Sequence, residues 1–238
     1  LPPYLDVYRS VAMSSVGIVA WKSALEDGTP YGSLSGAIYR NIPGVLKDVY
    51  SAPYPVFCMK DYERKYYALL RCALDADISY IICANPSSLL RFHQTVMDSY
   101  ADMVKDIRDG TLRKDVAEAL PPEDRDSVVS SFKPDAKRAA FLEKIMEEHG
   151  DGLLPRHYWP NLVCVNTWKQ GNCTQVLPRL RGYYPEKTAI REFGYQASEA
   201  RAGLALGNDW DYSVLAVHVY HLEFIEESQR ESDSPDVQ

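Results

Sequence analysis

Tyr195, Ser198 and Glu199 place an aromatic ring, a hydroxyl and a carboxylate close together, just after a run that is typical of a β-strand. An aromatic face can stack on a flat ring, a hydroxyl can donate to a phosphate oxygen, and a carboxylate can bind magnesium. A strand-end turn with an exposed glutamate has the same composition. The elements around these residues must therefore decide between the two interpretations.

The middle of the sequence predicts a helix followed by a buried strand and then another helix. Apolar residues recur at helical spacing in KDYERKYYALLRCALDAD (residues 60–77), and ISYIICA (residues 78–84) is a continuous apolar run too short for a helix of its own. After Asn85 and Pro86 one apolar stripe continues to Asp109. This stripe predicts a single long amphipathic helix.

Other runs complete an alternation of strands and helices. Residues 7–21 predict one or two strands, residues 162–168 and 187–194 also read as strands, and residues 212–227 alternate as a half-buried strand does. Residues 111–155 are charged and interrupted by prolines, and they predict a helical excursion at the surface. The alternation predicts an α/β protein with a mostly parallel sheet flanked by helices.

The loops after the strand-like runs 78–84, 162–168 and 187–194 are the expected place for a functional site. Ligands of open α/β sheets bind beyond the carboxyl ends of the strands. Tyr195 and its neighbours follow the last of these runs, so they should lie at the same rim.

Composition and charge exclude several classes of function. The formal net charge of -7 and the pI of about 5.3 argue against a nucleic-acid partner and against attraction to an anionic membrane. The apolar runs are far shorter than the roughly 20 residues that span a bilayer. No charged-then-apolar signal segment opens the chain, and we therefore expect a cytoplasmic protein.

Several phrases of the sequence resemble, in the same order, the Gretchen Hagen family of auxin-responsive acyl-acid amido synthetases. They are GTPYGSLSGAIYRNIPG, KYYALLRCALDADISYIICANPSSLLR, YADMVKDIRDGTL, YWPNLVCVNTWKQGNCTQVLPRLRGYYP, GYQASEARAGL and HLEFIEE. The family belongs to the adenylate-forming superfamily, which includes luciferases. The resemblance implies part of the large N-terminal domain of such an enzyme, with ATP and magnesium as cofactors and with a small carboxylic acid and an amine (an amino acid) as substrates.

GYQASE resembles the family's tyrosine-alanine-serine-serine-glutamate motif. Tyr195, Ser198 and Glu199 match it in place, whereas Gln196 and Ala197 depart from it. The resemblance implies that Tyr195 and Ser198 bind the nucleotide. It also implies that Glu199 is catalytic and holds the magnesium ion.

Two further loops resemble family segments that border the nucleotide and acyl pockets. The resemblance implies that Gly171 contacts the cofactor, and that Gln175, Ala84 and Asn85 contact the substrate. A helix amino terminus after Gly171 would also favour an anion. The alternatives are that Gly171 only turns the chain into a helix, and that Asn85 or Ser87 only caps one.

The resemblance implies that residues 1–238 are part of a larger enzyme. The phosphate-binding loop is expected upstream and the small C-terminal domain downstream, so the chain alone is expected to be inactive or nearly so. Two alternatives stay open. One is a non-catalytic protein of the same fold that binds a ligand or partner, and the other is a purely structural or interaction domain.

Overall fold

The structure is a computed structural model of the 238-residue chain. It describes residues 11–13, 23–24, 26–27, 30–31, 39, 41, 43–47, 50–197, 200–208 and 210–232. Ser198 and Glu199 lie outside these residues, as does most of the segment 7–21.

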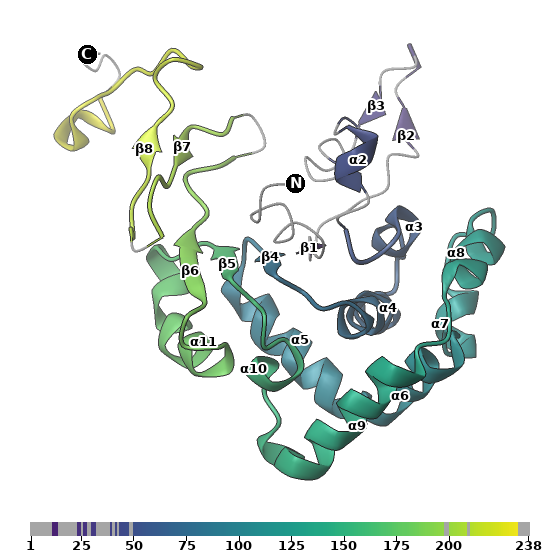
Figure 1. The fold of residues 1–238 in the computed structure, drawn as a ribbon. Coiled ribbons are helices and arrows are strands. Elements are labelled where there is room, and N and C mark those ends of the chain that lie inside the picture. The colour runs from purple at the N-terminus through teal and green to yellow at the C-terminus, as the bar shows by residue number, and fades with distance from the viewer. Residues whose placement is uncertain are drawn as a thin grey trace.

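A four-stranded parallel sheet forms the centre of the described chain, as predicted (Figure 1). Its strand order is β1-β4-β5-β6, and the strands are β1 (Val11–Met13), β4 (Tyr80–Ile82), β5 (Cys164–Thr167) and β6 (Ala189–Glu192). Because all four strands run in the same direction, their carboxyl ends share one edge of the sheet. The loops after β4, β5 and β6 therefore begin side by side.

Helices pack along the sheet and form a second layer outside it (Figure 1). The longer ones are α4 (Tyr62–Asp75), α5 (Pro86–Asp98), α6 (Tyr100–Asp109), α9 (Ala136–His149) and α11 (Leu177–Tyr183). The shorter elements are β2 (Ser23–Ala24), β3 (Pro30–Tyr31), α2 (Gly44–Lys47), α3 (Tyr54–Phe57), α7 (Lys114–Glu118), α8 (Arg125–Ser131), η2 (Gly150–Gly152), α10 (Pro155–Tyr158), η3 (Gly171–Gln175) and η4 (Glu227–Gln229). No helix in the described part of the chain is both long and apolar enough to cross a membrane.

Side chains at the helix ends explain where the helices start and stop. The carboxylate of Asp61 accepts the N–H of Arg64 at the start of α4 at 2.9 Å, and Asp135 accepts the N–H of Arg138 at the start of α9 at 2.8 Å. Each bond satisfies a backbone donor that the first helical turn leaves free. Gly110 ends α6 in the left-handed conformation, with φ of 67°.

The prediction of one long helix from Pro86 to Asp109 is wrong, because the helix is interrupted at Ser99. There φ is −131° and ψ is 19°, and the N–H of Ser99 bonds to the carbonyl of Val96 rather than to the residue four positions back. Serine has a lower helix propensity than the residues that usually fill the interior of a helix. The apolar stripe survives the break, since Val96 and Tyr100 are both buried.

The helices between residues 111 and 155 contribute to the main core of the protein. Their buried apolar side chains belong to the same cluster as those of α4 and the sheet, and they include Val116, Leu120, Val128, Ala139, Leu142 and Ile145. The helical pattern predicted from about Asp135 to His149 is confirmed as α9.

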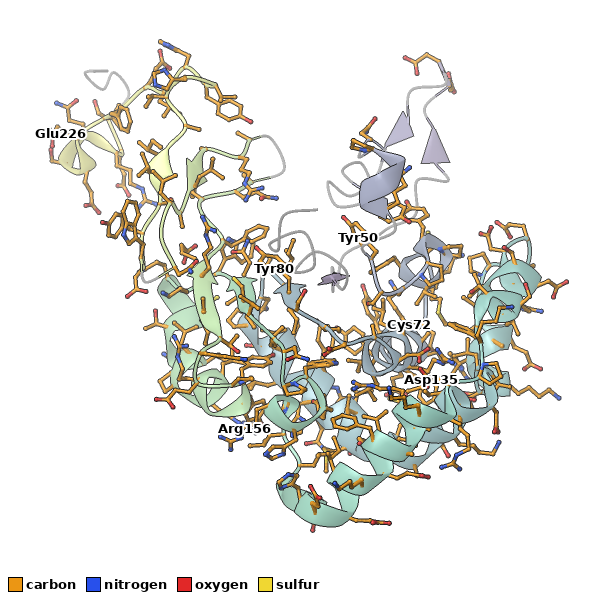
Figure 2. The ribbon with its side chains drawn as sticks, viewed as in Figure 1. Tyr50, Cys72, Tyr80, Asp135, Arg156 and Glu226 are labelled. Carbon is orange, nitrogen blue, oxygen red and sulfur yellow. The ribbon has the colours of Figure 1, made fainter. Side chains whose placement is uncertain are left out.

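The half-buried strand predicted for residues 212–227 is not formed. Within this segment only Val214–Leu215 (β8) forms a strand, antiparallel to Gly203–Leu204 (β7). A turn at residues 217–219 and irregular chain follow, with a single bridge at Ile225. The apolar side chains of this segment are largely exposed, and Glu226 marks how far it extends from the sheet (Figure 2). An alternating pattern needs a partner strand and a core to cover one face, and the described chain supplies neither beyond β7.

Candidate functional site at the carboxyl edge of the sheet

The loops after β4 and β5 are joined by the backbone carbonyl of Ala84. It accepts a hydrogen bond from the N–H of Trp168 at 2.9 Å and another from the hydroxyl of Thr167 at 3.1 Å. Thr167 is fully buried, so its hydroxyl needs this partner. The two loops are thereby fixed against each other at the edge where the sequence predicted a site.

A buried carboxylate joins the loops after β5 and β6. Glu192, only 6% exposed, accepts the N–H of Lys169 at 2.8 Å with one oxygen and the N–H of Gly194 at 2.9 Å with the other. The indole N–H of Trp168 adds a third connection by donating to the carbonyl of Gly194 at 3.1 Å. Each oxygen of the Glu192 carboxylate therefore holds the backbone of one of the two loops in place.

A pocket opens beside these loops and presents two exposed aromatic rings. Tyr195 is 66% exposed and Tyr212 is 60% exposed. We call this the tyrosine pocket, and its lining residues are Trp168, Gln170, Glu192, Gly194, Tyr195, Gln196, Asp211, Tyr212 and Ser213. Exposed aromatic faces of this kind suit a ligand with a flat ring.

The far wall of the tyrosine pocket comes from the segment before β8. The ammonium of Lys169 donates to the carbonyl of Trp210 at 3.1 Å and forms an ion pair with Asp211. The amide of Gln170 donates to the carbonyl of Asp211. The ring of Trp210 stacks on that of Tyr212 with centroids 4.8 Å apart. The contacts that anchor Trp210 and Asp211 therefore also hold Tyr212 at the pocket.

Most of the sequence matches a known family. The model of the GH3 family N-terminal domain matches residues 10–189, which is most of the chain. The chain belongs to the GH3 family. The predicted resemblance to the Gretchen Hagen family is thereby confirmed.

Curated relatives in the GH3 family are considerably longer than this chain. It is 28% identical over 193 residues to the probable indole-3-acetic acid-amido synthetase GH3.2 of Oryza sativa subsp. japonica, covering 79% of this chain and 31% of the relative. It is also 28% identical over 165 residues to the jasmonoyl-L-amino acid synthetase GH3.5 of the same species, covering 66% and 28%. The chain thus spans about a third of the curated relatives it matches.

Solved GH3 structures share the fold. The GH3.15 acyl acid amido synthetase superposes with a TM-score of 0.65 at 16% identity, covering 84% of this chain and 37% of the other. The AtGH3.15 acyl acid amido synthetase in complex with 2,4-DB gives a TM-score of 0.66 at 17% identity, with coverage of 84% and 35%. The predicted α/β fold with a mostly parallel sheet flanked by helices is confirmed.

The GH3 motif residues are only partly described. Tyr195 lines the tyrosine pocket, whereas Ser198 and Glu199 lie outside the described residues. The match to the GH3 family model ends at residue 189, before the motif. The roles of all three residues therefore stay predictions.

Gly171 and Gln175 lie at the two ends of η3, which follows β5 in the chain. Both are exposed, and within the described chain neither is among the residues that line the tyrosine pocket. Gly171 has a φ of 61°, so it makes the turn that the alternative interpretation requires. The expected helix is here a short 3-10 segment followed by seven-residue α11, which leaves little helix dipole for an anion.

Ala84 and Asn85 have structural roles that the geometry shows directly. The side chain of Asn85 accepts the N–H of Ser87 at 2.9 Å and caps α5, which is the alternative considered for this loop. Ala84 contributes its carbonyl to the rim. Contact of either residue with substrate remains a prediction.

Several residues that build the tyrosine pocket were missed from the sequence. Glu192 carried a readable signal, because alternation within β6 places it on the same buried side as Ile190 at the end of the strand. A charged residue on a buried strand face needs partners, and the nearest are loop N–H groups. Lys169, Trp210, Asp211 and Tyr212 carried none, since nothing in their spacing connects residues 169 and 210.

A magnesium ion in the tyrosine pocket would need carboxylate oxygens that are not already bound to other groups. In the described chain, Glu192 uses both oxygens on backbone N–H groups and Asp211 pairs with Lys169. No cluster of three or more possible ligands occurs among the described residues. A magnesium ion typically takes one or two protein carboxylates together with phosphate oxygens, and Glu199 is the remaining candidate close in sequence to the pocket.

Proposed function

We propose that this chain is part of an ATP-dependent ligase that activates a carboxylic acid as its acyl-adenylate and transfers the acyl group to the amine of an amino acid. The GH3 family match carries the proposal, since the relatives are named as indole-3-acetic acid-amido and jasmonoyl-amino acid synthetases. Residues 1–238 would be part of the large N-terminal domain, with 111–155 as its charged helical excursion.

The chemistry accounts for three substrates, the acid, ATP and the amine, and for three products, pyrophosphate, AMP and the amide. An oxygen of the acid's carboxylate attacks the α-phosphorus of ATP, and pyrophosphate leaves. The amine nitrogen then attacks the acyl carbonyl, AMP leaves, and the nitrogen loses its proton to solvent. Magnesium, when bound, would reduce the repulsion between the carboxylate and the phosphates.

The tyrosine pocket supports binding of the nucleotide base. Tyr195 and Tyr212 offer exposed aromatic faces at one pocket, and stacking of a base on such a ring contributes about 1 to 3 kcal/mol. Ser198 would donate to a phosphate oxygen and Glu199 would hold magnesium. Gly171, Gln175, Ala84 and Asn85 would border the nucleotide and the acid at the neighbouring loops.

Two measurements test the proposal. The first is a titration of the 238-residue chain with ATP, comparing Tyr195→Ala with Tyr195→Phe. We expect the phenylalanine variant to bind as the wild type does and the alanine variant to bind about tenfold more weakly, because only alanine removes the stacking face. Equal affinity of all three proteins would remove Tyr195 from the site.

The second measurement is carboxylic-acid-dependent exchange of pyrophosphate into ATP. It uses a protein that carries this chain together with the regions found in the longer relatives. Exchange with one class of acid, lost in Glu199→Ala, is the expected result. No exchange with any acid, in a protein that still binds ATP, would contradict the enzymatic proposal.

A second candidate function is ligand binding without chemistry on the same fold. Gln196 favours it, because this residue lines the tyrosine pocket at a position where the family motif has a small residue. Replacing Gln196 by alanine separates the two candidates. Exchange activity in the wild type supports the enzyme, whereas exchange that appears only in Gln196→Ala supports a binding protein that has lost the reaction.

A further inference from the structure

Lys169 joins its own loop to a segment more than forty positions away in sequence, Trp210 to Ser213. Its side chain is only 9% exposed, yet it carries a charge that needs partners. The backbone carbonyl of Trp210 and the carboxylate of Asp211 supply them. The segment that ends in Tyr212 is thus held where it satisfies a buried ammonium.

The loop that carries Lys169 is itself fixed on both sides. The backbone N–H of Lys169 donates to the carboxylate of Glu192, and the backbone carbonyl of Lys169 accepts a hydrogen bond from the hydroxyl of Thr174 at 3.0 Å. Glu192 binds the N–H of Gly194 as well, and Gly194 directly precedes Tyr195. These contacts therefore run from Gly194, next to Tyr195, through Glu192 and Lys169 to Trp210 and Asp211, next to Tyr212.

Asp211, in contrast, is the exposed end of this chain of contacts. Its side chain is 65% exposed, so the ion pair with Lys169 is open to water on one side. Opposite charges at such a position attract less strongly than a fully buried pair. Loss of the Lys169 contacts would therefore loosen this wall, which Gln170 also holds through the carbonyl of Asp211, while leaving the sheet intact.

We propose that Lys169 and Glu192 are positioning residues that hold Tyr195 and Tyr212 at one pocket. Neither needs to touch the reacting atoms. They keep the two aromatic rings in place before a ligand arrives, so that a flat purine ring does not have to order the Trp210–Ser213 segment on binding. The identity of the ligand rests on the proposed function, whereas the arrangement of the two walls does not.

The experiment measures the wall and the ligand separately. Backbone hydrogen exchange of residues 210–216 is followed in the 238-residue chain without nucleotide, and ATP affinity is measured by titration on the same samples. The variants are Lys169→Met, which keeps the length of the side chain without its charge, and Lys169→Arg, which keeps the charge. Lys144→Met is the matched control, because Lys144 lies on α9 in an exposed ion pair with Glu148.

We expect Lys169→Met to raise hydrogen exchange of residues 210–216 and the Kd for ATP together, each by about tenfold. Lys169→Arg should restore much of both, and Lys144→Met should behave as the wild type. Asp211→Asn provides a second test in an exposed residue that does not threaten folding. Combined with Lys169→Met it should add little, because both changes remove the same contact.

Unchanged hydrogen exchange of residues 210–216 in Lys169→Met and Asp211→Asn would overturn the proposal, since the wall would then be held by other contacts. Faster hydrogen exchange with an unchanged Kd for ATP would overturn it too, because the position of the wall would then have no effect on the affinity for ATP. A wild-type chain that binds no ATP while its exchange responds to Lys169→Met would contradict the proposed function and leave the role of Lys169 in holding the wall supported.

Discussion

Nδ1 of His157 accepts a hydrogen bond from the backbone N–H of Leu154 at 3.0 Å. A ring nitrogen can accept only when it carries no proton, so the contact requires a neutral imidazole. Partial burial lowers the pKa of His157, and the neighbouring His149 and Arg156 lower it further. The ring of His149 stacks on that of His157 with centroids 3.7 Å apart.

The first prediction is a loss of stability in acid. Since the pKa of His157 is lower in the folded state, the unfolded chain binds the proton first. The stabilisation is fully present above the unfolded pKa of about 6.5 and is lost as the pH falls through the lower folded value. Burial lowers the pKa of His93 as well, so both histidines contribute in the same direction.

Urea unfolding between pH 7.5 and pH 5 measures this effect. His157→Gln should flatten the dependence on pH, whereas His221→Gln should not, because His221 is largely exposed. A wild-type free energy of unfolding that rises as the pH falls from 7 to 5.5 would contradict the sign of the prediction.

The second prediction concerns the buried carboxylate of Asp106. It accepts the hydroxyls of Tyr67 and Thr111 and the N–H of Arg113, each at 2.8 Å. Tyr67→Phe removes one of these bonds and should cost about 1 kcal/mol. Asp106→Ala takes the acceptor from all three donors, including the buried Tyr67 hydroxyl, and should cost more, about 3 kcal/mol.

Denaturant unfolding would show the difference, with Tyr62→Phe as a control because Tyr62 is largely exposed. Equal free energies of unfolding for Tyr67→Phe and Asp106→Ala would mean that the carboxylate is not the centre of this network.

The third prediction compares two glycines. Gly110 has a φ of 67°, and a Cβ there would lie 2.5 Å from the nitrogen of Pro134, so Gly110→Ala should cost more than about 2 kcal/mol. Gly182 lies within α11 with no atom near its Cβ position, and Gly182→Ala should be neutral or stabilise by up to about 1 kcal/mol. Thermal unfolding of both variants tests the contrast, which disappears if Gly110 can relax away from Pro134.

The fourth prediction separates capping from substrate binding at Asn85. Asn85→Ala removes the acceptor of the Ser87 N–H and should cost about 1 kcal/mol, whereas Asn85→Asp keeps it. If capping is the only role of Asn85, neither variant changes the Kd for a carboxylic acid once stability is accounted for. A weaker Kd in Asn85→Asp, despite a wild-type free energy of unfolding, would show contact with substrate.

The elements that could be predicted are those whose periodicity and partners are both local. Residues 60–84 have a regular apolar stripe, a capping aspartate and an apolar strand, and they form α4 and β4 as expected. The break at Ser99 was not predictable, because the apolar stripe passes through it. The exposed course of residues 216–232 was missed for a related reason, since alternation indicates a potential strand and not the partner that it requires.

The site divides in the same way. Tyr195 was predicted because it follows a strand-like run at the expected carboxyl edge of the sheet and resembles a family motif residue. It lines the tyrosine pocket, and its role stays a prediction. Tyr212 reaches the same pocket through the contacts of Lys169 with Trp210 and Asp211, which are tertiary. A sequence pattern has no means of pairing positions that far apart without an element of known geometry between them.

The β7–β8 ribbon has a consequence for the behaviour of the protein in concentrated solution. Large apolar side chains such as Leu206, Val217, Val219 and Phe224 stand out from this part of the chain, beside strands whose edges lack a neighbour in the described structure. Unpaired edges flanked by apolar side chains favour association between copies and, eventually, precipitation. Solubility should therefore be limited by residues 203–225 rather than by the helical layer, and charged substitutions there would be the direct remedy.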